Sequence, residues 1–485
     1  MDRQCEARCF SPLVGIARLP VCSYPAPGSA ENPVADALGR VAGYLQWSNR
    51  SGSFGDVITQ DARVLIKPNF VLHQNQGPSD LEPLITHSSL VRATVEAALE
   101  SGAREVLVGD APIQSCDFAA LLRATGLDSW ASDLAGNNPR FKGIKDFRRT
   151  TCLVTRGVRV AAEAAQPLEE FALFNLGTDS LLEPITNDGG GFRVSWYDSR
   201  PLSRAHHRGC HQYLVTKEVL NADVVINLPK LKTHKKAGVT CALKNSIGIN
   251  GNKEFLPHHR IGGSATGGDC YPGGSAVKLA LERVADRQNR ASSSTAAMIW
   301  HAFAFGLSRV ARWQGDRVGI DGSWSGNDTI WRTCLDINRI LLYGRPDASM
   351  AEIPQRRILH LVDAVVAGQG NGPLASDPLQ LGLILASENP VAMDWAGALL
   401  LGYDPARIPI ICRGFERFRW PLVTFPPEDV HVTGDLGEGA AGAVLRPSYT
   451  VEHPLGWRDA AATRVGRPDS RTAPQLPPLT QSWDA

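Results

Sequence analysis

Short apolar runs that stop at polar residues and a proline recur along the chain. Val64–Ile66 forms the first run and is followed by Lys67 and Pro68. The runs 105–108 and 223–227 are each followed by a proline within four residues. Continuous apolar runs of this length are typical of strands buried on both faces of a parallel sheet, and a proline ends the hydrogen-bonded ladder. The pattern therefore predicts three buried strands.

A helical period lies between the first two runs. Residues 90–100 place apolar side chains at near-helical spacing, with Ser88 or Ser89 as the cap in front and Gly102 behind. Strand, helix and strand in this order predict a βαβ unit with parallel pairing and a right-handed crossover.

The parallel pattern returns in the second half of the chain. The run 358–362 ends at Asp363, and the run 381–386 leads to Asn389 and Pro390. Asparagine as the N-cap with proline at the first helical position predicts that a helix starts here. The expected fold is α/β, with a mostly parallel sheet, helices on both faces and an inserted helical layer.

Composition shifts divide the chain into three parts. Residues 1–60 are rich in Pro, Gly and Ser and are expected to form an irregular N-terminal arm. Residues 61–445 carry the α/β pattern, with a helical insert at about 275–343. Residues 446–485 are rich in Pro, Arg and Thr, which predicts a loosely packed C-terminal tail.

The charge balance argues against partners that need a strong global field. The net charge is +1, with 43% hydrophobic and 20% charged residues, so neither nucleic acid nor an anionic membrane is an expected partner. No secretory signal is recognisable at the N-terminus, and the apolar stretch 299–307 is too short to span a bilayer. We expect a cytoplasmic protein, and a homo-oligomer is compatible with the sequence.

The cysteines do not suggest a disulfide scaffold or an iron–sulfur cluster. Ten cysteines are dilute in 485 residues, and their spacing is irregular. Cys5, Cys9 and Cys22 lie close in sequence, but no further ligands follow at ferredoxin or zinc-ribbon spacing. The cofactor is left unknown: a divalent metal stays open, and an iron–sulfur cluster is not expected.

Polar residues at the strand ends predict a ligand site. In open parallel sheets, ligands bind outside the carboxyl ends of the strands, where the following loops converge. Polar strand ends can also simply face solvent, and for any one residue that interpretation stands beside the functional one. The residues expected to bind a ligand are Lys67, Asn69, Lys230, Thr240, Asn245, His259, Arg260, Asp363 and Asn371.

The stretch 226–274 concentrates basic residues in a nearly neutral chain. A local positive charge suits a phosphate- or carboxylate-bearing ligand, although most charge runs are solvated surfaces. Lys244 and Asn245 lie inside a small, apolar stretch, and a buried lysine needs a partner or a lowered pKa. His234, Lys244 and Lys232 are therefore the predicted catalytic residues.

Metal ligation is a further interpretation of the same stretch. Asp110, His258 and Asp269 are the candidate ligands, although no HExxH or related spacing is present. Asp328, Arg332 and Asp336 follow at four-residue spacing, which favours ion pairing on one helix face. The chain contains neither a Walker loop nor GxGxxG, so nucleotide hydrolysis and dinucleotide binding lose support.

Six segments resemble the domain of unknown function 362 family over roughly residues 60–420. They are KPNF at 67–70, INLPKLKTH at 226–234, TCALKNSIGING at 240–251, LPHHRIGG at 256–263, DAVVAGQGNGP at 363–373 and NPVAMD at 389–394. The segment 326–338 is similar to a longer subgroup with an extra helical insert. Many members carry a ferredoxin-like module that this chain lacks, so their iron–sulfur role does not transfer, and the resemblance implies no particular reaction.

Three functional hypotheses remain open. The first is an enzyme that holds a small anionic metabolite with Lys230, Lys232 and Arg260 and transfers a proton through His234 or Lys244. Such an enzyme could use a metal as well. The second is a non-catalytic ligand-binding or scaffold protein. The third is an iron–sulfur redox protein.

Overall fold

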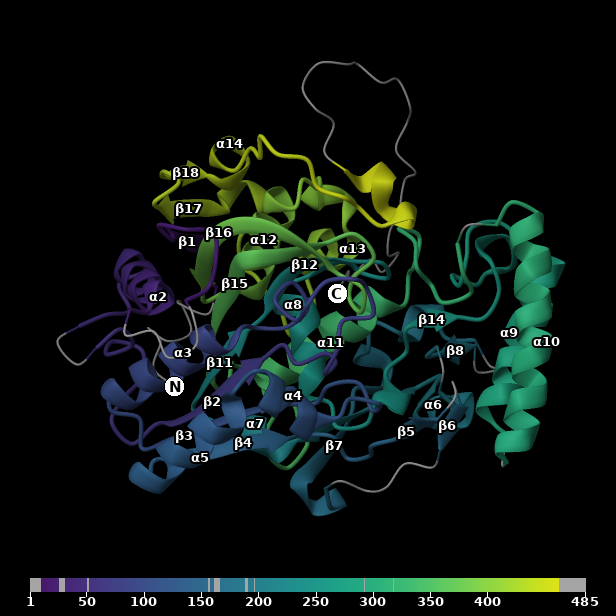
Figure 1. The fold of residues 1–485 in the computed structure, drawn as a ribbon, viewed down its shortest axis with the longest axis horizontal. Coiled ribbons are helices and arrows are strands. Elements are labelled where there is room, and N and C mark those ends of the chain that lie inside the picture. Colours follow the sequence, from purple (N-terminus) through teal and green to yellow (C-terminus); the bar gives the residue numbers. More distant parts are fainter. Residues whose placement is uncertain are drawn as a thin grey trace, which may run out of the picture.

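The computed structural model describes residues 10–25, 31–49, 52–155, 158–160, 166–187, 191–195, 197–291, 293–316 and 318–461. A large, twisted sheet runs through the molecule (Figure 1). Within the described residues it has eleven strands, in the order β18-β17-β1-β16-β15-β11-β2-β3-β4, with β12 beside β15 and β13 beside β12. The strands are β1 (Leu13–Arg18), β2 (Arg63–Pro68), β3 (Glu105–Asp110), β4 (Phe141–Asp146), β11 (Val224–Leu228), β12 (Lys230–His234), β13 (Gly238–Thr240), β15 (Arg357–Gln369), β16 (Asp377–Ser387), β17 (His431–Gly434) and β18 (Gly439–Ala440).

The predicted runs form the parallel centre of this sheet. β15, β11, β2, β3 and β4 pair parallel, with Val225 opposite Leu65 and Leu65 opposite Leu107. β16 pairs antiparallel with both β15 and β1, so the expectation that the run 381–386 continues the parallel pattern is wrong. A short connection from β15 reverses the chain, which permits only antiparallel pairing.

Helices cover both faces of the sheet, and two more lie at one edge of the molecule (Figure 1). They are α2 (Pro33–Tyr44), α3 (Ser88–Glu100), α4 (Phe118–Ala124), α5 (Leu127–Asn137), α6 (Ser199–Ala205), α7 (Lys217–Leu220), α8 (Ala242–Asn245), α9 (Ala276–Asn289), α10 (Ser294–Trp313), α11 (Ile330–Tyr343), α12 (Pro390–Leu400), α13 (Pro409–Cys412) and α14 (Ala441–Val444). Val64 and Ile66 pack into the core under α2 and α3, whereas Leu65 points into the core that contains α11. Successive residues of a strand point to opposite faces, so one apolar run supplies both cores. The predicted α/β class with a mostly parallel sheet is confirmed.

Shorter strands lie outside the large sheet. β7 (Phe171–Asn175), β10 (Cys210–Thr216) and β9 (His206–His207) form one small sheet, and β8 (Phe192–Arg193) pairs with β14 (His259–Arg260). β5 (Leu153–Thr155) pairs with β6 (Val158–Val160).

The expected helical insert contains helices with different surroundings. α9 and α10 pack side by side at one edge of the molecule (Figure 1). Every residue of α11 is buried, so this helix belongs to the core and the interpretation of 275–343 as one added layer is wrong for it. Its face pairs Arg332 with Asp328 as expected, whereas Asp336 pairs with Arg339.

The two ends of the chain hold regular or packed structure where the sequence suggested little. β1 and α2 lie within the expected irregular arm, because β1 pairs with β16 and β17, far away in sequence. At the other end, Trp457 is buried and its Nε1 donates to the Lys235 carbonyl over 2.7 Å. Residues 446–461 are therefore anchored, and the rest of the expected tail, 462–485, lies outside the described residues. In the described part of the chain, no helix combines the length and the apolar character needed to cross a bilayer.

Candidate functional site

A cavity of about 220 Å³ lies where β2, β3 and β12 end. The segment after Lys67, Asp110 and the 230–234 strand contribute side chains to it, as the strand-end argument predicts, and His258 joins them from a loop. Sites for drug-sized ligands usually enclose about 300–1,000 Å³, so this one suits a small metabolite. Its polar lining residues are Asn69, Asp110, Ser195, Lys232, His234, Lys235, Lys236, Thr240, Lys244, Asn245, Lys253, His258 and Asp321.

A buried ion pair forms the floor of this cavity. Lys67 Nζ lies 2.8 Å from Asp110 Oδ1, and both side chains are almost fully buried. The other carboxylate oxygen of Asp110 accepts the Phe70 N–H over 2.8 Å, and Asn245 Oδ1 accepts from Lys67 Nζ over 3.3 Å. Asp110 and Asn245 thus line the cavity, and Lys67 binds both of them from behind without lining it.

The lining carries an excess of positive charge. Five lysines face two carboxylates, and each carboxylate already has a lysine partner: Lys67 for Asp110, and Lys235 for Asp321 at 3.0 Å. Burial lowers the pKa of Lys236 to about 8 and that of Lys253 to about 7. An anionic ligand would compensate the remaining charges.

Lys244 is buried without a hydrogen-bond partner in the described part of the chain. Its residue is 8% exposed, and α8 places it in the cavity wall. Burial, assisted by the charge of Lys67, lowers its pKa. Lys232 lies in the same wall and donates to the Leu84 carbonyl; burial and the charges of Lys230 and Lys244 lower its pKa strongly.

Two histidines that line the cavity have opposite tautomers. His234 Nδ1 accepts the backbone N–H groups of Lys236 and Ala237 over 3.0 and 3.1 Å, so the proton of the neutral ring is on Nε2. His258 Nδ1 donates to the Leu256 carbonyl over 2.6 Å, which leaves a lone pair on Nε2 of its neutral ring. Burial and the charges of Lys244 and Lys232 hold the pKa of His234 well below its usual range.

Two further polar atoms in the lining have no partner among the described residues. They are Thr240 Oγ1 and Asn69 Oδ1, both fully buried. Unsatisfied buried polar atoms are rare and costly, and they concentrate where a ligand or water binds. The wall therefore offers several unused donors and acceptors to a bound molecule.

Some predicted site residues lie elsewhere. Lys230 and Asp363 form a fully buried ion pair at 2.7 Å, and the Tyr24 hydroxyl donates to Asp363 and accepts from Lys230, each over 2.6 Å. Neither of these two side chains lines the cavity. The expectation that they contact a ligand there is not met by this arrangement.

The segment after His258 diverges from the cavity. Arg260 pairs with Asp269 at 3.5 Å, and Asp269 accepts from Thr329 Oγ1 over 2.6 Å. Asn371 and His259 line a larger cavity of about 830 Å³ that borders the first and shares Val194, Ser195, Lys235 and Asp321 with it. Asp110, His258 and Asp269, the predicted metal ligands, are not brought together as a set.

Sequence reasoning missed several lining residues. Lys236 and Lys253 belong to the basic stretch, and their place beside the predicted motifs was the available signal. Asp321 and Ser195 come from loops far away in sequence and carry no such signal. Cys5 and Cys9 lie outside the described residues, and Cys22 is exposed.

These features define a mixed α/β protein with a basic cavity at the carboxyl ends of its parallel strands. The sequence profile of a domain of unknown function (DUF362) matches residues 64–170 and 177–399. The chain belongs to this family, and the resemblance seen in its motifs is confirmed.

One relative and two solved structures extend the comparison. The chain is 25% identical over 358 residues to the thylakoid-associated protein sll1697 of Synechocystis, covering 74% of this chain and 68% of that protein. A Thermotoga maritima protein (TM-score 0.32) and the lactate racemase apoprotein of Thermoanaerobacterium thermosaccharolyticum (TM-score 0.31) are each 10% identical. They match 76% and 73% of this chain, which spans only 58% and 52% of those chains.

Proposed function

We propose that this protein is an enzyme that binds a small carboxylate- or phosphate-bearing metabolite in the basic cavity and moves a proton on it. The observation that carries the proposal is Lys244, a buried amine in the wall with no partner in the described part of the chain. A buried lysine that serves only the fold has an ion-pair partner, as Lys67 and Lys230 do here.

The surrounding lysines suit the anionic group. Lys232, Lys236 and Lys253 line the same cavity, and no carboxylate of the described lining is left to neutralise them. They replace Lys230 and Arg260, which the sequence suggested as anion ligands. The small volume favours a metabolite with few heavy atoms.

The remaining groups supply the proton chemistry. With its pKa lowered, Lys244 can lose its proton to become a base that accepts one from the bound molecule. His234 presents an Nε2–H group that can donate to the oxygen on which negative charge develops. His258 Nε2 provides a second acceptor. The net step moves one proton from a carbon or oxygen of the ligand to Lys244.

Exchange with solvent deuterium tests this step. The full-length protein is incubated in D₂O with short hydroxy acids, keto acids and phosphate monoesters, and proton NMR follows the loss of C–H signals and the appearance of products. We expect Lys244→Met to reduce the rate by about 10²–10⁴-fold. Lys142→Met, which alters an exposed lysine, is the matched control and should keep the rate.

His234→Gln separates an enzyme from a binding protein. For an enzyme, this variant lowers the rate more than the affinity, because the Nε2–H group acts on developing charge. A binding or scaffold protein would show affinity without turnover for the wild type, and that result contradicts the proposal. Unchanged turnover in Lys244→Met would contradict it as well.

A further inference from the structure

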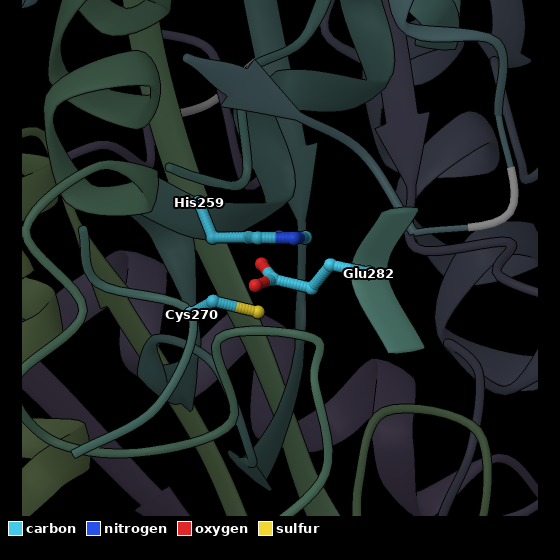
Figure 2. Close-up of side chains that lie close together, drawn as sticks. All are labelled: His259, Cys270 and Glu282. Atoms are coloured by element: carbon cyan, nitrogen blue, oxygen red, sulfur yellow. The ribbon is translucent and has the colours of Figure 1, made fainter. Parts of the chain in front are cut away.

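Three side chains that sequence reasoning did not group lie together beside the larger cavity. His259 belongs to β14, Cys270 to the following loop, and Glu282 to α9. Each offers one ligand atom, these atoms lie within 4.8 Å of one another, and all three residues are buried. Figure 2 shows the three side chains lying together, with the carboxylate between the imidazole and the thiol. Among the described residues, this is the one group of three or more such side chains.

The hydrogen bonding of the cluster is incomplete. His259 is 3% exposed, and its Nδ1 is fully buried without a partner among the described residues. Glu282 accepts the Gly262 N–H over 3.0 and 3.1 Å but forms no ion pair within the described part of the chain. A buried imidazole nitrogen without a hydrogen-bond partner and a buried carboxylate without a counter-charge are unfavourable unless another group binds them. Glu282 also forms hydrogen bonds with the Cys270 thiol and the Tyr271 hydroxyl, but neither bond provides a partner for His259 Nδ1.

We propose that His259, Cys270 and Glu282 bind a divalent transition metal, with zinc the best match. Thiolate sulfur, imidazole nitrogen and carboxylate oxygen are the donors that zinc takes in proteins. Metal–ligand bonds of about 2.0–2.3 Å in a tetrahedron place ligand atoms about 3.3–3.8 Å apart, so the side chains need to close by at most about 1.5 Å. One thiolate and one carboxylate balance the charge of the ion.

Binding follows a defined proton balance. The S–H bond of Cys270 breaks, its sulfur forms a bond to the metal, and the proton leaves to solvent. The carboxylate and the neutral imidazole each donate a lone pair, and nothing is oxidised or reduced. The Gly262 N–H group already holds the carboxylate of Glu282 and acts as an outer partner of this ligand.

The position of the cluster leaves room for another ligand. His259 and Glu282 both line the cavity of about 830 Å³, so a fourth ligand can reach the ion from that side. Three protein ligands with one open position are typical of catalytic zinc, whereas structural zinc is closed by four. The inference is independent of the proposed function, because Lys244 and His234 do not line this cavity.

Cobalt(II) titration of the full-length protein tests the site. After treatment with a chelator and dialysis, we expect one equivalent of cobalt to bind and to give a thiolate-to-cobalt charge-transfer band in the near ultraviolet. Visible bands of tetrahedral intensity should accompany it, zinc should abolish both, and about one proton should be released per ion. Absence of the charge-transfer band in the wild type would overturn the proposal without any variant.

Variants assign the ligands. Cys270→Ser should lose the charge-transfer band, and Glu282→Gln should bind cobalt at least about 100-fold more weakly. Cys116→Ser removes a buried cysteine outside the cluster and should keep the full spectrum. A band that persists in Cys270→Ser would assign the metal to another cysteine and overturn the proposal. If either cluster variant does not fold, His259→Gln provides the same test of affinity.

Discussion

Asp394 has a buried carboxyl group that contacts the short helix carrying Lys244. It lies on α12, is fully buried, and its Oδ1 accepts the Leu243 N–H of α8 over 3.3 Å. Burial raises the pKa of Asp394 to about 7. The carboxyl group therefore gains or loses its proton near neutral pH. It lies beside the short helix whose third residue is Lys244.

This pKa makes the stability of the protein depend on pH. A carboxyl group with a raised pKa binds its proton more tightly in the folded than in the unfolded protein, so its contribution is complete below about pH 4 and is lost as the pH rises through about 7. The loss amounts to up to roughly 4 kcal/mol for a shift of this size. We expect Asp394→Asn to flatten the decline in unfolding free energy between pH 5 and pH 8, measured in urea. Equal slopes for variant and wild type would disprove this assignment.

Among elements, the turn that follows α8 packs directly on the ends of two strands. The 3₁₀ turn Ser246–Ile249 places the Gly248 carbonyl 2.9 Å from the Ala111 N–H. A Cβ atom on Gly248 would lie 2.1 Å from Asp110 Oδ1 and 2.5 Å from Lys67 Nζ. Only glycine lets the turn approach the ion pair beneath the cavity.

Gly248→Ala should therefore separate Lys67 from Asp110. Disrupting a buried pair without replacing it costs about 3–5 kcal/mol, so we expect a loss of unfolding free energy of that order in urea denaturation. Gly136→Ala is the matched control, since a Cβ at this helical position meets nothing within 4 Å. It should gain up to about 1 kcal/mol from the helix preference of alanine. Similar losses in both variants would contradict the proposed contact.

Elements were predictable where their signal is local. The runs at 64–66, 105–108 and 223–227 gave β2, β3 and β11, and Asn389 caps α12 as expected, accepting the Val391 and Ala392 N–H groups. β1 gave no such signal, because its partners β16 and β17 lie more than 350 residues away. Its place in the sheet depends on tertiary pairing, which local composition does not encode.

At the scale of the whole molecule, the sequence predicts that the polar strand ends converge on one site. It does not predict which of their side chains point into that site. The segments that follow Lys67 and Asp110 and the 230–234 strand meet at one edge of the sheet, because the ends of parallel strands must, and His258 joins them from a loop. Which residues face the cavity depends on partners that only the fold supplies. Lys230 turns to Asp363 and Tyr24, whereas Lys253 and Lys236 turn to the cavity.

The charge of the cavity should make the stability of the whole molecule respond to anions. Lys253 has a pKa of about 7, set by burial, partly offset by Asp110 and reinforced by the charges of Lys67, Lys244 and Arg148. Its amine is charged below that pH and largely neutral above it. An anion that binds the folded protein raises its melting temperature, and the increase grows with affinity.

Sulfate is a suitable probe, because its own charge does not change between pH 6 and pH 9. We expect the wild type to bind sulfate about tenfold more tightly at pH 6 than at pH 9. This difference of about 1.4 kcal/mol is detectable by thermal unfolding. Sulfate also stabilises proteins by exclusion from their surface, and this general effect is common to all variants. Lys253→Met should lose a large part of this difference and keep the part that is due to Lys236, whose pKa of about 8 also lies in this pH range. Lys142→Met, at an exposed position, should behave as the wild type. If Lys253→Met retains the whole difference between the two pH values, the cavity is not where the anion binds.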